Sequence, residues 1–146
     1  MKKSRRMQPV VKVAEGREQQ AARLLGESQA ALAQARQRLE ELQEYRRDYE
    51  RRFAESGALG MGAVQMEDYR QFLSRLGLAI DQQMQVVAQS EAALERQRQH
   101  WFVTRGKTQA LDGVVARYQA EEQRDADRRE QQESDEYALR GSRQRR

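Results

Sequence analysis

The side chains that most often carry chemistry are scarce in this sequence. His100 is the only histidine, and no position holds cysteine. These counts exclude a disulfide, a thiolate zinc site, a cysteine nucleophile and a metal site built on several imidazoles. A lone histidine next to Trp101 and Phe102 is typical of a packed or solvent-facing position on a helix.

The glycines of "ESGALGMG", residues 55–62, do not form a phosphate-binding loop. Their spacing matches neither G-x-x-x-x-G-K-[ST] nor a G-x-G-x-x-G that follows a strand. The many carboxylates alternate with arginines along helical faces, where ion pairing in solvent is their ordinary role. The sequence therefore predicts no catalytic residue, no cofactor and no metal, in a protein that is not an enzyme.

The composition favours long helices over a globular core. Only 38% of the 146 residues are apolar and 34% are charged, with one proline. Such a chain cannot build a thick core, so a seam shared between helices is the expected core, and the predicted fold class is all-α. The formal net charge of +4 fits nucleic acid or an acidic protein face equally well.

No segment of the sequence reads as a targeting signal or a membrane span. The opening "MKKSRRMQPVVKVAEG" is basic but lacks the apolar run of a secretory signal, and no stretch approaches the length that a membrane-spanning helix needs. We therefore expect a cytoplasmic protein.

The first heptad seam of apolar residues begins at Ala21 and ends at Phe53. Steps of four and three alternate without a slip, and only Ser28 and Arg46 are polar, which is the pattern of a coiled coil. The seam consists of Ala21, Leu25, Ser28, Leu32, Ala35, Leu39, Leu42, Arg46, Tyr49 and Phe53.

The second heptad seam follows the glycines and is longer. It also advances in steps of three and four, and Glu67 and Asp68 supply acidic residues suited to a first helical turn. This seam consists of Met66, Tyr69, Leu73, Leu76, Ile80, Gln83, Val87, Ser90, Leu94, Gln97, Trp101, Thr104, Thr108, Leu111, Val115 and Tyr118.

Each of the two helices has one apolar stripe, and a short glycine-rich connection joins them. This arrangement predicts a hairpin, because folding back buries both stripes. Gly57 is expected to end the first helix in the left-handed conformation. We predict one domain over residues 1–146, an antiparallel coiled-coil hairpin with helix one at about 9–56, the turn at about 57–63, helix two at about 64–139 and a basic tail at 140–146. A parallel dimeric coiled coil remains the alternative, since heptads do not report strand direction.

A turn centred near residue 60 brings together residues whose numbers sum to about 120. Helix two, about 110 Å long against about 70 Å for helix one, then extends past its partner. The extension "QAEEQRDADRREQQESDEY" has few apolar residues and carries acids near a helix C-terminus, which favours fraying. Both chain ends are basic and lie at the same end of the hairpin.

Near the turn the apolar set is wider than a two-helix seam requires. Tyr45, Phe72 and Ala79 lie off the seam, and Tyr45 lies level with Arg75. An exposed patch with three aromatic rings is typical of a protein contact. The alternative is a locally thicker seam, with Tyr45 and Phe72 folded over it. The patch consists of Leu42, Tyr45, Tyr49, Phe72, Leu76 and Ala79.

The length, the two basic ends, the longer second helix and this patch resemble the FliJ family of flagellar type III export proteins, over essentially the whole chain. The resemblance implies a rod similar to the central stalk of rotary ATPases. Arg38 stands where the family has glutamine and Gln83 where it has histidine, at the outer edges of the patch. Leu42, Tyr45, Tyr49, Phe72, Leu76 and Ala79 are the residues that the resemblance assigns to export-gate contacts.

The resemblance also implies partners. The end that bears both termini would engage and stimulate the hexameric flagellar export ATPase, and the patch would contact the cytoplasmic domain of the export-gate membrane protein. Export chaperones are further partners in the family. The free protein would be a monomer in the cytoplasm, peripherally associated with the export apparatus at the inner membrane. Candidates for the ATPase end, interpreted as seam residues in the first place, are Val10, Val13, Leu111, Val115 and Tyr118.

Two other functions remain open at this stage. An equivalent stalk of a virulence-type secretion system would share the fold and differ in its ATPase. A generic basic scaffold or nucleic-acid binder would need a dense Arg/Lys stretch continuous with the heptads, whereas here the basic runs are short, terminal and flanked by acids. We therefore expect no nucleic-acid binding.

Overall fold

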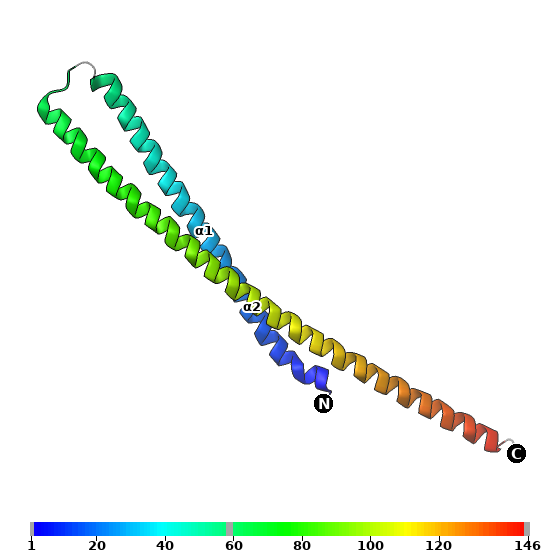
Figure 1. The fold of residues 1–146 in the computed structure, drawn as a ribbon. Coiled ribbons are helices and arrows are strands. Elements are labelled where there is room, and N and C mark those ends of the chain that lie inside the picture. Colours follow the sequence, from blue (N-terminus) through cyan, green and yellow to red (C-terminus); the bar gives the residue numbers. More distant parts are fainter. Residues whose placement is uncertain (1, 58–59, 145–146) are drawn as a thin grey trace. The chain divides into compact units, whose positions relative to one another are not determined.

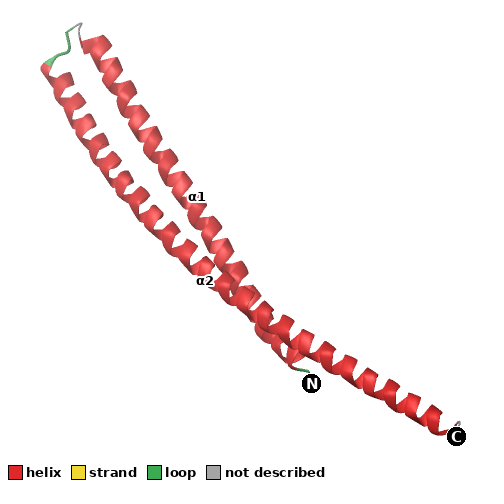
Figure 2. Cartoon of the chain, turned by 45° about the vertical axis from the view of Figure 1, so that its right-hand side comes forward, coloured by secondary structure: helices red, strands yellow, loops and turns green. Residues whose placement is uncertain are grey.

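The computed structural model describes residues 2–57 and 60–144, which form two long helices. Helix α1 runs over Lys3–Gly57 and helix α2 over Ala63–Gln144 (Figure 1). Every element in these residues is helical (Figure 2), so the predicted all-α fold with a longer second helix is confirmed. Residues 58–59 of the predicted turn and 145–146 of the predicted tail lie outside the described residues.

The internal contacts divide the chain into two units. The turn unit is Ala21–Trp101, and the terminal unit joins the residues up to Gln20 with those from Phe102 onward. Each helix contributes one segment to each unit. The two units are described separately below.

In the turn unit the segments of α1 and α2 lie side by side and run in opposite directions (Figures 1 and 2). Gln83 donates from Nε2 to the carbonyl oxygen of Ala35 at 3.0 Å, and Arg36 pairs with Glu91 at 3.1 Å. Both partners of the ion pair are more than half exposed, so it contributes at most about 1 kcal/mol. The chain therefore folds back on itself, as predicted, with contacting residues whose numbers sum to about 120.

In the terminal unit the start of α1 lies beside α2 in the same antiparallel sense (Figure 1, blue and yellow). The Thr108 hydroxyl donates to the carbonyl oxygen of Ala14 at 3.3 Å. Ser4 is hydrogen-bonded to Glu122 through its hydroxyl and its N–H. These contacts follow the same register as those of the turn unit.

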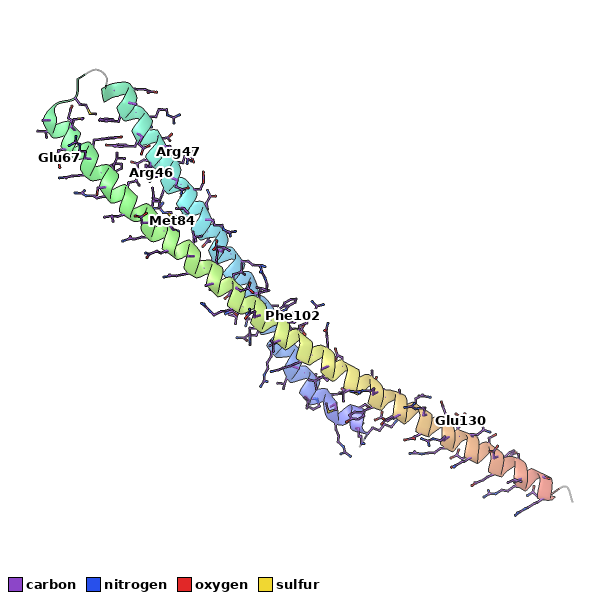
Figure 3. The ribbon with its side chains drawn as sticks, viewed as in Figure 1. Arg46, Arg47, Glu67, Met84, Phe102 and Glu130 are labelled. Atoms are coloured by element: carbon purple, nitrogen blue, oxygen red, sulfur yellow. The ribbon has the colours of Figure 1, made fainter. Side chains whose placement is uncertain are left out.

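The heptad seams predict the packed faces of both helices. Every predicted seam residue, from Ala21 to Phe53 and from Met66 to Tyr118, is buried or half-buried. This includes Arg46 (Figure 3), whose aliphatic stem can cover apolar surface while its guanidinium stays in water. The prediction succeeds because a side chain's place on a long helix follows directly from its spacing.

Helix α1 begins earlier than predicted. It starts at Lys3, so Pro9 lies inside the helix and not in its first turn. A proline in the interior removes one backbone hydrogen bond and normally ends a helix. Here Glu122 accepts hydrogen bonds from the N–H and hydroxyl of Ser4, and this carboxylate stabilises the exposed N–H groups of the first turn.

The left-handed glycine of the turn is Gly60, with φ of 94°, whereas Gly57 was predicted. Gly57 is the last residue of α1, and the Phe53 ring lies against it, 3.5 Å from where a Cβ would stand. The Gly60 N–H donates to the Gly57 carbonyl oxygen at 3.4 Å, and the Met66 N–H donates to Gly62 at 3.1 Å. The reversal therefore begins beyond the end of α1.

Helix α2 continues past its predicted end at residue 139, through Gly141 and as far as Gln144. Gly141 does not adopt a positive φ, so it does not cap the helix. The extension is helical throughout its described part, and its fraying in the free chain stays a prediction. Hydrogen bonds one turn apart, from Gln123 to Asp127 and from Gln131 to Asp135, stabilise such an exposed helix, and Arg143 in the last turn complements its dipole.

Candidate protein-binding site

A ladder of five aromatic rings joins α1 and α2 near the turn. The Phe53 and Tyr69 rings are stacked with centroids 3.6 Å apart, and Tyr69 stacks on Tyr49 at 5.4 Å. Tyr49 then contacts Phe72 at 4.3 Å. The edge of the ladder is Tyr45, whose ring meets Phe72 at 5.8 Å and an interplanar angle of 76°. The rings come alternately from the two helices, which holds this part of the turn unit in register.

The environment of Tyr69 reflects this packing. Partial burial in the ladder raises the pKa of the Tyr69 hydroxyl above its ordinary value, and the Glu50 carboxylate and Tyr49 raise it further. Desolvation and a nearby negative charge both disfavour the phenolate. Tyr69 is therefore a packing residue of the ladder.

Next to the outer edge of the ladder lies an open groove of about 510 Å³ between the two helices. Its floor is apolar: Leu76 is only 7% exposed, whereas the Tyr45 ring at the side is 52% exposed. A partly wet aromatic ring beside a dry aliphatic floor is suited to receive an apolar side chain from another protein. The groove is lined by Arg38, Glu41, Leu42, Tyr45, Phe72, Arg75 and Leu76.

The rim of the groove carries an ion pair on α1 and an arginine on α2. Arg38 lies 3.7 Å from Glu41, and both side chains are more than half exposed. Arg75 has no ion-pair partner among the residues that the structure describes. An arginine left unpaired beside an apolar floor favours a partner that brings a carboxylate next to an apolar anchor.

The structure brings together most of the predicted patch. Leu42, Tyr45, Phe72 and Leu76 line the groove, and Tyr49 supports it through its contacts with Tyr45 and Phe72. Ala79 is half-buried on α2 and does not line the groove. Tyr45 is 52% exposed and packs on Tyr49 and Phe72, so its ring thickens the seam and also faces solvent.

Sequence reasoning missed three parts of this site. Arg75 was noted only as level with Tyr45, Glu41 was not considered, and Arg38 was noted only as a departure at the edge of the patch. Phe53 and Tyr69, assigned to the seam, turn out to form the base of the ladder. Gln83, the other departure, is a seam residue that donates to Ala35.

In the terminal unit the candidate ATPase-end residues fall into two groups. Leu111, Val115 and Tyr118 are half-buried in the seam, and the Lys3 ammonium lies 5.6 Å from the Tyr118 ring centroid. Val10 and Val13 are 47% and 55% exposed, so their assignment to the seam was wrong. The seam of α1 instead continues back from Ala21 through Glu18, Ala14, Val11 and Met7 to Ser4, which is the heptad path that leaves Val10 and Val13 outside.

Ser4 and Glu122 close this end of the packed helices. The Ser4 hydroxyl donates to Glu122 Oε2 at 2.7 Å and the Ser4 N–H to Oε1 at 3.1 Å. These two hydrogen bonds, with a smaller contribution from Lys2, lower the pKa of Glu122. The lowered pKa has the expected physical cause, because donors that face a carboxylate favour its charged form.

The described residues contain no group of three or more histidine, cysteine, aspartate or glutamate side chains that could hold a metal ion. In the same part of the chain, neither helix has a window long and apolar enough to cross a membrane. The groove of the turn unit combines an apolar floor with a partly exposed aromatic ring.

The fold defines the class: a two-helix coiled-coil protein. The model of the flagellar FliJ protein family matches residues 2–146, and the chain belongs to this family. Members are non-catalytic components of the flagellar type III protein export machinery. No curated protein and no solved structure matches the chain.

Proposed function

We propose that this chain is a stalk-like component of the flagellar export apparatus. Residues 1–146 act as one hairpin. The terminal unit engages and stimulates the hexameric export ATPase, and the groove of the turn unit binds the cytoplasmic domain of the export-gate membrane protein. The protein is not an enzyme, binds no cofactor, and works as a monomer in the cytoplasm at the inner-membrane export apparatus. Export chaperones are additional partners.

The observation that carries this proposal is the groove. Family membership accounts for the export apparatus, and the apolar floor with the half-exposed Tyr45 ring and the unpaired Arg75 offers a partner an apolar anchor site beside a positive charge. The six residues proposed for the gate contact are Leu42, Tyr45, Tyr49, Phe72, Leu76 and Ala79.

The terminal unit supports the ATPase contact in a different way. Val10 and Val13 are exposed on α1, on the same stripe as Arg6 and Arg17 in the heptad pattern. An apolar pair flanked by arginines suits a protein surface with acidic edges. Leu111, Val115 and Tyr118 then serve this contact indirectly, by holding α2 against α1.

The ATPase contact is tested by titrating the purified chain into the flagellar export ATPase of the same organism and following ATP turnover. We expect stimulation that saturates near one chain per six ATPase subunits, because a single rod occupies one ring. A flat response with a competent ATPase would contradict the proposal. Stimulation of only a virulence-type ATPase would assign the chain to that system, and salt-sensitive binding to nucleic acid alone would favour a basic scaffold.

The charge of the groove rim gives a second test. Replacing Arg75 by Glu should weaken binding to the gate domain by roughly tenfold at low salt, and the difference should shrink as salt is raised. The reason is that Arg75 has no carboxylate partner of its own and is available to one from the gate domain. Binding would be measured by calorimetry at two salt concentrations.

Arg70→Glu is the matched control for this change. Arg70 is an exposed arginine of α2 in the same unit, and it does not line the groove. Equal losses in the two variants would mean that only the overall charge of the turn unit matters, and would remove Arg75 from the proposed contact.

A further inference from the structure

The two units bury different kinds of residue. All five buried hydrophobic residues among those described belong to the turn unit: Ala21, Leu32, Ala35, Leu76 and Ile80. The three buried polar residues, Ser4, Thr104 and Thr108, all belong to the terminal unit. Apolar burial drives helix association, whereas a buried hydroxyl mainly exchanges a hydrogen bond to water for one within the protein. The seam of the terminal unit is therefore the weaker one.

The Thr108 hydroxyl in the terminal seam does not depend on the opposite helix alone. Thr108 Oγ1 lies 3.1 Å from the Thr104 carbonyl oxygen of its own helix, closer than the Ala14 carbonyl oxygen of α1 at 3.3 Å. A hydroxyl that can bond within its own turn loses little when the partner helix leaves. Thr108 thus fills the seam while contributing little to holding it closed.

The helices of the terminal unit are also less stable in themselves. Pro9 lies inside α1 and costs about 3 kcal/mol relative to alanine in a helix interior. Gly16, Gly106 and Gly113 lie inside the helices with open space around them, each at a cost of about 1 kcal/mol. No packing advantage offsets these costs, because none of the three glycines permits a close approach. Gly26 and Gly77 of the turn unit lie in equally open space, so Pro9 is the main intrinsic difference between the helices of the two units.

The hydrogen bonds of Ser4 to Glu122 join the beginning of α1 to α2, beside the Lys3 ammonium over the Tyr118 ring. Both carboxylate oxygens of Glu122 accept hydrogen bonds from Ser4, which lies in the first turn of α1. This pair lies at the far edge of the packed seam, since the side chains beyond Glu122 in the described part of α2 are exposed. Glu130, labelled in Figure 3, is one of these exposed residues.

We propose that residues 3–20 of α1 form a releasable arm: they separate from α2 in a local opening that leaves residues 21–101 packed, and the Ser4–Glu122 pair is the latch that limits this opening. The proposal concerns the free chain and stands whether or not the ATPase contact exists. Its physical basis is that local opening begins where few apolar contacts are lost.

Native-state hydrogen exchange of the full-length chain, read by mass spectrometry, tests the arm. Amides of residues 11–18 and 104–118 should exchange at least about tenfold faster than those of residues 28–49 and 69–94. Glu122→Gln and Ser4→Ala should each accelerate exchange of the terminal unit by a further factor of roughly ten, since charge-assisted hydrogen bonds are lost, without altering the turn unit.

Glu130→Gln is the matched control, because it removes the same charge from an exposed part of α2. Equal effects of Glu122→Gln and Glu130→Gln would overturn the latch. Equal exchange rates in the two units of the unmodified chain would overturn the arm itself.

A cross-link provides an independent test. Because the chain has no cysteine, two introduced cysteines are the only thiols that can react. Ala14→Cys combined with Thr108→Cys places two thiols at positions that the structure brings into contact. Joining them with a short bismaleimide should slow exchange of the terminal unit at least tenfold relative to the same variant before cross-linking. Unchanged exchange after complete cross-linking would show that opening does not require separation of the helices.

Discussion

Replacing Tyr45 and Phe72 together by alanine should reduce affinity for the cytoplasmic domain of the export gate by at least about a hundredfold, because buried aromatic anchors each contribute about 2 kcal/mol or more at such interfaces. Tyr45 is the exposed wall of the groove and Phe72 is the ring that supports it. The helical content should stay near that of the unmodified chain, since Leu76 and Ile80 remain buried in the seam. Calorimetry and circular dichroism measure the two quantities.

The chain offers a matched control for this double variant. Phe102 and Tyr137 are likewise one phenylalanine and one tyrosine, 72% and 81% exposed, and both lie in the terminal unit. Phe102→Ala with Tyr137→Ala should leave affinity for the gate unchanged. If the control variant lost as much affinity as the groove variant, or if neither lost any, the groove would not be the contact.

Truncating Ile80 should produce the largest loss of stability available from one side chain of the turn unit. Ile80 is 3% exposed, and Ile80→Ala should lower the free energy of unfolding by about 2–5 kcal/mol, through lost burial and the cavity that remains. In so thin a core few neighbours can close that cavity. Denaturant unfolding followed by circular dichroism gives the value.

Leu78 is the control two positions away on the same helix, and it is 61% exposed. Leu78→Ala should change the free energy of unfolding by less than about 0.5 kcal/mol, since surface substitutions rarely do more. A similar cost for both variants would mean that the heptad seam is not the stabilising core of the turn unit.

The same difference between the two units links stability to function. The turn unit combines buried aliphatic side chains with a ladder of five rings, so it can present the groove as a rigid surface. Binding to a pre-organised surface avoids the cost of ordering it. The terminal unit has the softer seam, which suits a region that a partner reshapes.

Much of this fold could be predicted from spacing alone. Every position that the steps of three and four select from Ala21 to Tyr118 is packed, because each residue of a straight helix advances the side chain by the same angle. The glycines of residues 55–62 allow the chain to reverse, and this reversal buries the apolar stripes of the two helices against each other. The aromatic patch was also recognisable, since Tyr45 and Phe72 are apolar residues that no two-helix seam requires.

Other features depend on residues that meet only in the folded chain. Helix α1 starts at Lys3 because Ser4 finds Glu122, 118 positions away, and no local pattern around Pro9 contains that contact. Arg75 belongs to the groove because α1 places Tyr45 and Leu42 opposite it. The left-handed residue of the turn is Gly60, while Gly57 stays helical beside the Phe53 ring.

The sequence by itself therefore determined the number of helices and the face that each one buries, since these follow from periodicity along a single chain, whereas their antiparallel direction was predicted from the glycines and established by contacts between the helices. Tertiary structure decided where α1 begins, which glycine reverses the chain, that Val10 and Val13 face solvent, and that the buried apolar residues gather in one unit and the buried hydroxyls in the other. The physical reason is that each of these depends on contacts between distant residues, whose free energies outweigh local propensity.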